Sequence, residues 1–142
     1  AAEPQVLMLV LLDTDVCIHL INRRAGFERV LRRLSGRSIG EICISAITVS
    51  ELRFGVAKSA HGSANAAALE EFLSRFDLLD YPVDASASYA KIRSELERAG
   101  TPIGNNDLLI AAHAMAIKAG VATANLGEFQ RVKGLKVLDW LS

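Results

Sequence analysis

Three carboxylates of this 142-residue chain stand beside apolar segments, where a ligand site can form. Asp13 ends the run VLMLVLL, Glu51 follows the run EICISAI, and Asp107 precedes the run LLIAAHAMAI. Carboxylates that converge cannot all stay ionised unless their charge is compensated. A hard divalent cation such as Mg²⁺ or Mn²⁺ prefers oxygen ligands and carries waters that can act as nucleophiles. The three acids together therefore indicate an acidic metal site.

Each acid also has a simpler interpretation as a helix cap. Acids in the first turn of a helix satisfy backbone N–H groups and complement the helix dipole. Thr48 and Glu51 match the S/T-x-x-E capping box, in which Glu51 would bond back to the N–H of Thr48. For a single acid capping is the commoner explanation, so the metal site rests on the three acids as a set.

Alternating apolar runs and amphipathic segments predict the elements that position these acids. Strands are expected at 6–12, 41–47, 77–83, 121–125 and 135–140. Helices are expected at 14–20, about 27–34, from Thr48, from Ser63 to Phe76, at 84–99 behind Asp84 as cap, and from Asn105 as cap to Gly120. This order predicts an α/β domain with a mostly parallel sheet, whose ligands bind beyond the carboxyl ends of the strands.

Composition narrows the class of protein. The chain has 16 basic and 16 acidic residues, so no global field favours a nucleic-acid partner, although basic residues can still cluster locally. Cys17 and Cys43 are isolated, which argues against zinc and fits a reducing cytoplasm. No apolar run approaches the ~20 residues of a membrane span, so no membrane partner is expected. We expect residues 1–7 to be a leader, either an expression remnant or a disordered segment, ahead of a single domain at 8–142.

Four segments of the chain resemble the successive motifs of one family. They are LLDTDVCIHLI, ISAITVSELRFGVAKS, GTPIGNNDLLIAAHAMA and VATANLGEFQRVKGLKVLDW. In order and spacing they are similar to VapC-type toxins, the ribonucleases of the PIN-domain superfamily, over nearly the whole stretch from Met8 to Trp140. The resemblance implies a three-layer α/β/α PIN-like domain and a Mg²⁺- or Mn²⁺-dependent endoribonuclease.

The resemblance carries over to individual residues. Asp13, Glu51 and Asp107 match the three acids of the family and are the implied catalytic and metal-binding residues. Many PIN domains carry a fourth aspartate after the fourth strand, where this chain has Asn125, with Glu128 three residues on. Asn125 could bind metal or a ligand water through its amide oxygen, and Glu128 could supply charge from the loop. Relatives commonly have asparagine at the position of Asp15, which could hold Asp13 or a bound water in place.

The resemblance also implies partners. A VapB-type antitoxin would neutralise the toxin, and operator DNA would be bound only through the antitoxin. The RNA substrate would be a tRNA or, in some relatives, ribosomal RNA. A homodimer within a larger toxin–antitoxin complex is expected. The apolar stretch 16–21 would leave Ile18 and Leu20 partly exposed, as a groove for a partner helix.

Two other functions compete with the ribonuclease. Asp13 and Asp15 match the D-x-D signature of haloacid-dehalogenase-type phosphatases, with Asp13 as nucleophile. Cys17 stands where that motif next has Thr or Val, and NND is a poor substitute for its downstream acidic pair. A non-enzymatic metal-binding module of the receiver type would need a lysine near the end of a late strand, and VATAN has none.

Other polar residues favour structural roles. Residues 23–37 hold six arginines and one acid, Glu28, which fits a solvated helix face better than a phosphate-contacting edge. His113, on an apolar helix, is expected to be a hydrogen-bonded core or site-edge residue rather than a ligand. Thr14 and Thr123, near strand ends, are expected to cap helices or orient waters.

Overall fold

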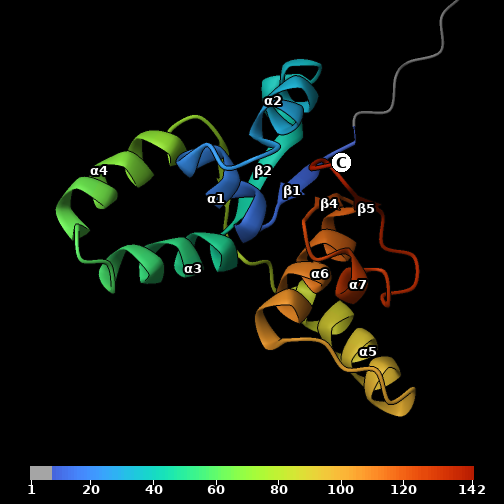
Figure 1. Cartoon of the computed structure of the whole chain (residues 1–142). Helices are drawn as coiled ribbons and strands as arrows, with labels where there is room; N and C mark the ends of the chain where they lie inside the picture. The colour runs from blue at the N-terminus through green and yellow to red at the C-terminus, as the bar shows by residue number, and fades with distance from the viewer. Residues whose placement is uncertain (1–7) are drawn as a thin grey trace, which may run out of the picture.

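Five short strands form one parallel sheet in the order β3-β2-β1-β4-β5 (Figure 1). The computed structural model describes residues 8–142, so the leader predicted at 1–7 lies outside the described part. All four neighbouring pairs of strands are parallel. The strands are β1 (Val10–Leu12), β2 (Ile42–Ser45), β3 (Asp77–Leu79), β4 (Gly120–Ala122) and β5 (Val137–Leu138).

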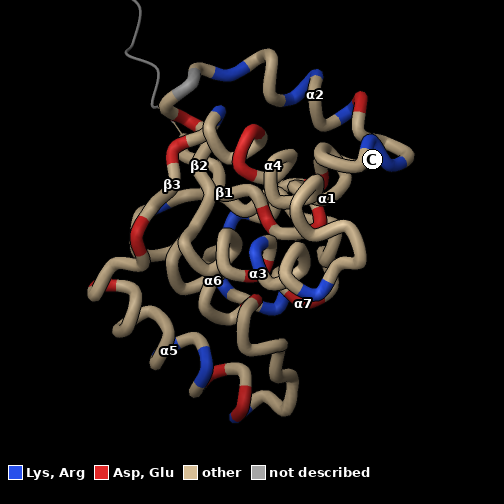
Figure 2. Tube along the Cα trace, turned by 90° about the vertical axis from the view of Figure 1, so that its left-hand side faces the viewer, with Lys and Arg blue, Asp and Glu red and all other residues tan. Residues whose placement is uncertain are grey.

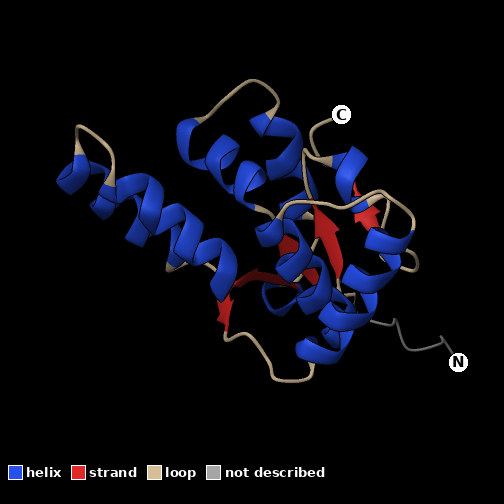
Figure 3. Cartoon of the chain, turned by 90° about the horizontal axis from the view of Figure 1, so that it is seen from below, coloured by secondary structure: helices blue, strands red, loops and turns tan. Residues whose placement is uncertain are grey.

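Helices cover both faces of this sheet and give a three-layer α/β/α domain (Figures 1 and 3). Leu11 packs on one face with α5, α6 and α7, while Val10 and Leu12 pack on the other with α1 to α4. Burial on both faces explains why β1 is a continuous apolar run. The predicted fold class is confirmed. The helices are α1 (Thr14–Asn22), α2 (Phe27–Ser35), α3 (Ala46–Ala57), α4 (Gly62–Leu73), α5 (Ala85–Arg98), α6 (Asn105–Ile117) and α7 (Leu126–Phe129), with a 3-10 turn at Ile39–Glu41.

The beginning of α3 differs from the predicted capping box. Ser45, the last residue of β2, is the N-cap, and its Oγ accepts the N–H of Ile47 at 3.2 Å. Thr48 therefore lies inside the helix, and its buried hydroxyl has no hydrogen-bond partner among residues 8–142. The prediction that Glu51 and Thr48 cap this helix is wrong, because a better-placed serine precedes them. Glu51 consequently lies in the second turn of α3 rather than the first.

Several other boundaries also shift. The helix predicted from Ser63 begins at Gly62 without a side-chain cap, and Asp84 holds the N-cap position of α5 without a side-chain bond. Asn105 is the first residue of α6 rather than its cap, and α6 ends before Lys118, which is left-handed with φ 58°. The strand predicted at 121–125 ends at Ala122, because the chain turns there into the short helix α7.

Helices α3 and α4 form a hairpin that extends from one side of the sheet (Figures 1 and 3). Leu52 of α3 and Leu69 and Leu73 of α4 are buried in the same core as α1. In the described residues no helix is both long and apolar enough to cross a membrane.

Candidate active site

Asp13 anchors the site at the carboxyl end of β1. Its backbone N–H donates to the carbonyl of Ala122 in β4 at 2.9 Å, and its side chain is only 3% exposed. Oδ1 accepts the N–H of Thr14 at 2.8 Å, which makes Asp13 the N-cap of α1, and Oδ2 accepts the hydroxyl of Thr123 at 2.7 Å. Burial raises the pKa of Asp13, and the bonds from Thr123 and Thr14 offset part of that rise. Capping and site formation therefore use the same carboxylate.

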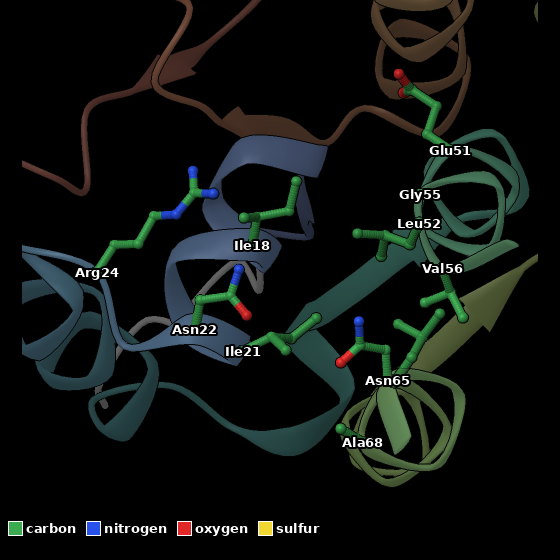
Figure 4. Close-up of a pocket in the computed structure, with 11 residues that line it drawn as sticks. Ile18, Ile21, Asn22, Arg24, Glu51, Leu52, Gly55, Val56, Asn65 and Ala68 are labelled. Carbon is green, nitrogen blue, oxygen red and sulfur yellow. The ribbon is translucent and has the colours of Figure 1, made fainter. Parts of the chain in front are cut away.

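Glu51 reaches the site from α3, on the neighbouring strand–helix unit. Its Oε1 accepts the hydroxyl of Thr14 at 2.8 Å, so α1 and α3 are joined beside Asp13. The negative charge of Glu51 contributes to the raised pKa of Asp13. The side chain is half-buried and also lies at the edge of a groove between α1, α3 and α4 (Figure 4).

Asp107, Asn125 and Glu128 form the opposite half of the site. The Asn125 amide Nδ2 donates to Oδ2 of Asp107 and to Oε2 of Glu128, both at 2.8 Å. Asp107 lies in the first turn of α6, and Glu128 lies in α7 rather than in a loop. An amide between two carboxylates must present its NH₂ group, because its oxygen would repel them. Asn125 thus clamps the two acids through its NH₂ group. Binding of an ion or a water through its amide oxygen stays a prediction.

The pKa of Asp107 is raised to about 8, first by burial and then by its hydrogen bond to Glu128 and the charges of Asp13 and Glu128. The pKa of Glu128 is lowered, chiefly by its hydrogen bond with Asp107 and also by those from Asn125 and the Gly104 backbone. The two carboxyl groups therefore share a proton at neutral pH, with Asp107 as its holder. A bound cation would relieve the repulsion between carboxylates that lie this close together.

The donor set fits a hard divalent ion. The charge of Asp13 contributes to the raised pKa of Asp107, and the groups that donate to the two carboxylates from Thr14, Thr123 and Asn125 are all neutral. In residues 8–142 no three Asp, Glu, His or Cys side chains come close enough together to hold an ion by themselves. Mg²⁺ does not require three, because it is commonly held by one or two carboxylates and retains several waters. Asp13 and Asp107 could hold such an ion.

The remaining polar residues of the sequence prediction lie away from this centre. Asp15 is exposed on α1 and acts on Asp13 only through its charge. His113 is buried, and its Nδ1 lies 2.8 Å from the Ser45 hydroxyl, so its expected core role is confirmed. The basic residues of α2 lie apart from α6 and α7 (Figure 2). Arg29 donates to the carbonyl of Leu141, and Arg37 pairs with Glu41, which supports the solvated-face interpretation.

Three groups hold the carboxylates in a way that the sequence did not predict. Thr14 joins Asp13 to Glu51, Thr123 joins Asp13 to β4, and the Gly104 N–H supports Glu128. The signal for the threonines was present, because both directly follow a strand end or its aspartate. Their partners could not be read from the sequence, because Thr123 and Asp13 are 110 residues apart.

The fold and this acidic site define a class of protein. The family model described as PIN domain matches residues 10–135. The chain therefore belongs to the PIN-domain family. The phosphatase and receiver-type alternatives are set aside by this result.

Within that family the chain is similar to VapC ribonucleases. It is 39% identical over 134 residues to "Ribonuclease VapC2" of Rickettsia felis, covering 94% of this chain and 98% of that protein. It is 40% identical over 130 residues to "tRNA(fMet)-specific endonuclease VapC" of Salmonella typhimurium, covering 92% and 96%. The crystal structure of VapBC2 from Rickettsia felis bound to a DNA fragment from their promoter superposes with a TM-score of 0.85 and 38% identity, covering 94% and 99%.

The raised pKa of Asp107 predicts that the metal-free protein loses stability as pH rises. Folding raises this pKa from 3.8 to about 8, so the stabilising contribution is complete below 3.8 and is lost as pH rises through about 8. We expect the melting temperature in excess chelator to fall between about pH 4 and about pH 8 and to level off above that. The Asp107→Asn variant should show a flatter profile over the same range. Superimposable profiles of the two proteins would contradict the assignment of this titration to Asp107.

Proposed function

We propose that this chain is a divalent-metal-dependent endoribonuclease that acts as the toxin of a toxin–antitoxin pair. The observation that supports this most directly is that the charge of Asp13, buried at the carboxyl end of β1, contributes to the raised pKa of Asp107 at the start of α6. Two carboxylates that resist joint ionisation are poised for a cation. In a nuclease such an ion offsets phosphate charge and activates water. Mg²⁺ or Mn²⁺ suits the all-oxygen donors.

In this proposal each acid has a distinct role. Asp13 and Asp107 hold the ion directly, and Asp13 is fixed against the sheet by Thr14 and Thr123. Glu51, held by the Thr14 hydroxyl, accepts a proton from the attacking water or orients it. Asn125 keeps Glu128 beside Asp107, so that Glu128 supplies negative charge at the fourth position of the site.

The substrate and the surroundings of the reaction are proposed from the relatives. The Salmonella relative carries the name of a tRNA(fMet)-specific endonuclease, and we propose a tRNA substrate in the cytoplasm for this chain. Because net charge is zero, RNA affinity must come from local contacts and from the bound ion rather than from a global field. A homodimer, and operator binding through the antitoxin, complete the proposal.

A groove beside the site suits the proposed antitoxin. It has a volume of about 320 Å³ and runs between α1, α3 and α4 (Figure 4). Ile18 and Ile21 of α1 face Leu52 and Val56 of α3 across it, and Glu51 marks the end nearest the site. A second hollow on the other side of α1 includes Leu20. The expectation that Ile18 and Leu20 are only partly buried is confirmed, and an amphipathic helix of a partner is the occupant that such apolar walls favour.

Metal removal tests the proposed chemistry. Excess chelator should abolish RNA cleavage, because no ion then offsets the charges of Asp13 and Glu128, and Asp107 keeps a proton instead of binding an ion. Added Mg²⁺ or Mn²⁺ should restore cleavage, measured as the appearance of RNA ends on a labelled tRNA. Cleavage that continues at full rate in chelator would show that the reaction does not use a metal.

Glu51→Gln separates charge from structure. Glutamine can still accept the Thr14 hydroxyl, so the melting temperature should stay near that of the wild type. Cleavage should fall by at least ~100-fold, because the neutral amide cannot take a proton or orient water through charge. Glu70→Gln, an exposed acid of α4 paired with Arg53, is the matched control and should cleave normally. Normal cleavage by Glu51→Gln would leave Asp13 and Asp107 alone to form the site.

A charge introduced into the groove should weaken binding of the antitoxin without changing RNA cleavage. Ala68 lines the groove and is exposed in the free chain, whereas Ala64 on the same helix does not line it. Ala68→Glu should raise the dissociation constant for the proposed VapB-type antitoxin by at least ~10-fold. Ala64→Glu should leave it unchanged, as measured by calorimetric titration. Equal affinity of both variants would place the partner elsewhere.

A further inference from the structure

A buried histidine and a serine join the two helices that carry Glu51 and Asp107. Ser45 ends β2 and begins α3, the helix of Glu51. His113 lies in α6, the helix of Asp107, and is 1% exposed. The Nδ1 of His113 and the Oγ of Ser45 are 2.8 Å apart, although 68 residues separate them along the chain. This is the one side-chain hydrogen bond between α6 and the β2–α3 unit in residues 8–142.

The arrangement of donors assigns the direction of this bond. The Ser45 Oγ already accepts the N–H of Ile47, and its own proton reaches no acceptor in the described chain other than Nδ1. Burial lowers the pKa of His113, so the imidazole stays neutral and Nδ1 can accept. Ser45 therefore donates to Nδ1, and the ring proton lies on Nε2. One serine side chain thus caps α3 and holds α6.

Tyr81 fixes the imidazole from a third direction. Its ring meets the ring of His113 edge to face, with centroids 5.4 Å apart and planes at 81°. Tyr81 follows β3, so the histidine is held between the end of β2 and the segment after β3. Such aromatic pairs contribute orientation as well as burial. The imidazole is consequently held by its nitrogen and by its ring.

We propose that Ser45 and His113 are a positioning pair that sets α6 against α3, and thereby sets Asp107 against Glu51 and Asp13. This inference rests on the proposed ribonuclease and names residues outside its site. Neither residue touches the carboxylates, so the pair acts through the helices that it joins. The buried neighbours of His113 along α6 are Ala111, Ala112 and Ala114, whose methyl groups give apolar contact without a directional bond. A displacement of about 1 Å at a reacting group can cost roughly 100-fold in rate.

Two substitutions of His113 separate the hydrogen bond from the packing. His113→Asn keeps an acceptor close to the position of Nδ1 but loses ring volume. His113→Leu keeps most of the volume and has no acceptor. If His113 only fills space, Leu is the milder change. If it positions α6 through Ser45, Asn is the milder change.

Three readouts are measured on each variant: melting temperature, kcat and KM for a labelled tRNA, and the affinity for Mn²⁺ by electron paramagnetic resonance. For His113→Leu we expect kcat to fall ~10- to 100-fold with KM nearly unchanged, and Mn²⁺ affinity to fall ~10-fold, the scale for losing a supporting group. For His113→Asn we expect kcat and Mn²⁺ affinity to stay within ~3-fold of the wild type. This should hold even if His113→Asn melts at a lower temperature than His113→Leu.

Thr48→Val is the matched control. It removes a buried hydroxyl from α3 that has no partner in residues 8–142, so kcat and Mn²⁺ affinity should match the wild type. The proposal is overturned if Asn is impaired more than Leu, or if both match the wild type. If the wild type binds Mn²⁺ but cleaves no RNA, the proposed ribonuclease fails, and the ranking of Mn²⁺ affinities still decides on the positioning pair.

Discussion

The buried carboxylate of Asp13 is the constraint on which the rest of the site depends. A charge at the end of a buried strand costs several kcal/mol unless hydrogen bonds or a counter-charge compensate it. Here the backbone of Thr14 and the hydroxyl of Thr123 donate to it, and each such bond to a charged group contributes about 1.5–3 kcal/mol. These bonds also tie β1 to α1 and to the end of β4. The group that is costly to bury therefore organises the carboxyl edge of the sheet.

All the side chains that hold the acids are neutral. Thr14 donates to Glu51, Thr123 to Asp13, and Asn125 to both Asp107 and Glu128. A lysine or arginine in any of these places would form an internal ion pair and cancel the charge. Hydroxyl and amide donors fix the geometry and leave the negative charge in place. Arg131 does lower the pKa of Glu128 through its charge, but its guanidinium donates to the carbonyl of Pro102 instead. The result is a rigid site that remains able to attract a cation.

The sequence predicted the architecture well because each signal was local. The apolar run before Asp13 and the alternation of strands and helices follow from burial, and both were confirmed. The errors arose where tertiary contacts decide. Thr48 and Glu51 fit a capping box, but Ser45 at the strand end begins the helix earlier, and Glu51 turns to Thr14, 37 residues away. Helix α7 was missed because four residues are too few to show a period.

The same distinction applies to the site residues. The positions of Asp13 and Asp107 follow from strand ends and helix beginnings, which a sequence displays. The role of Asn125 does not, because its amide could face either way until Asp107 and Glu128 are seen on both sides. The hydrogen bond between Ser45 and His113 could not be predicted from the sequence either, because 68 residues separate them. Local pattern thus predicts which residues reach the edge of the sheet, and only the folded chain shows which of them hold the others.

Helix α1 contributes residues to both the groove and the acidic site, so a partner in the groove can affect the site. Asp13 caps this helix, Thr14 in its first turn holds Glu51, and Ile18 and Ile21 line the groove further along. Glu51 itself lies at the boundary between groove and site (Figure 4). A partner that packs against Ile18 and Ile21 would contact helix α1. This helix has Asp13 as its N-cap and holds Glu51 through Thr14. A partner could therefore inhibit the proposed toxin without competing for the metal ligands. A shift of α1 would move the Thr14 hydroxyl, which holds Glu51 in place.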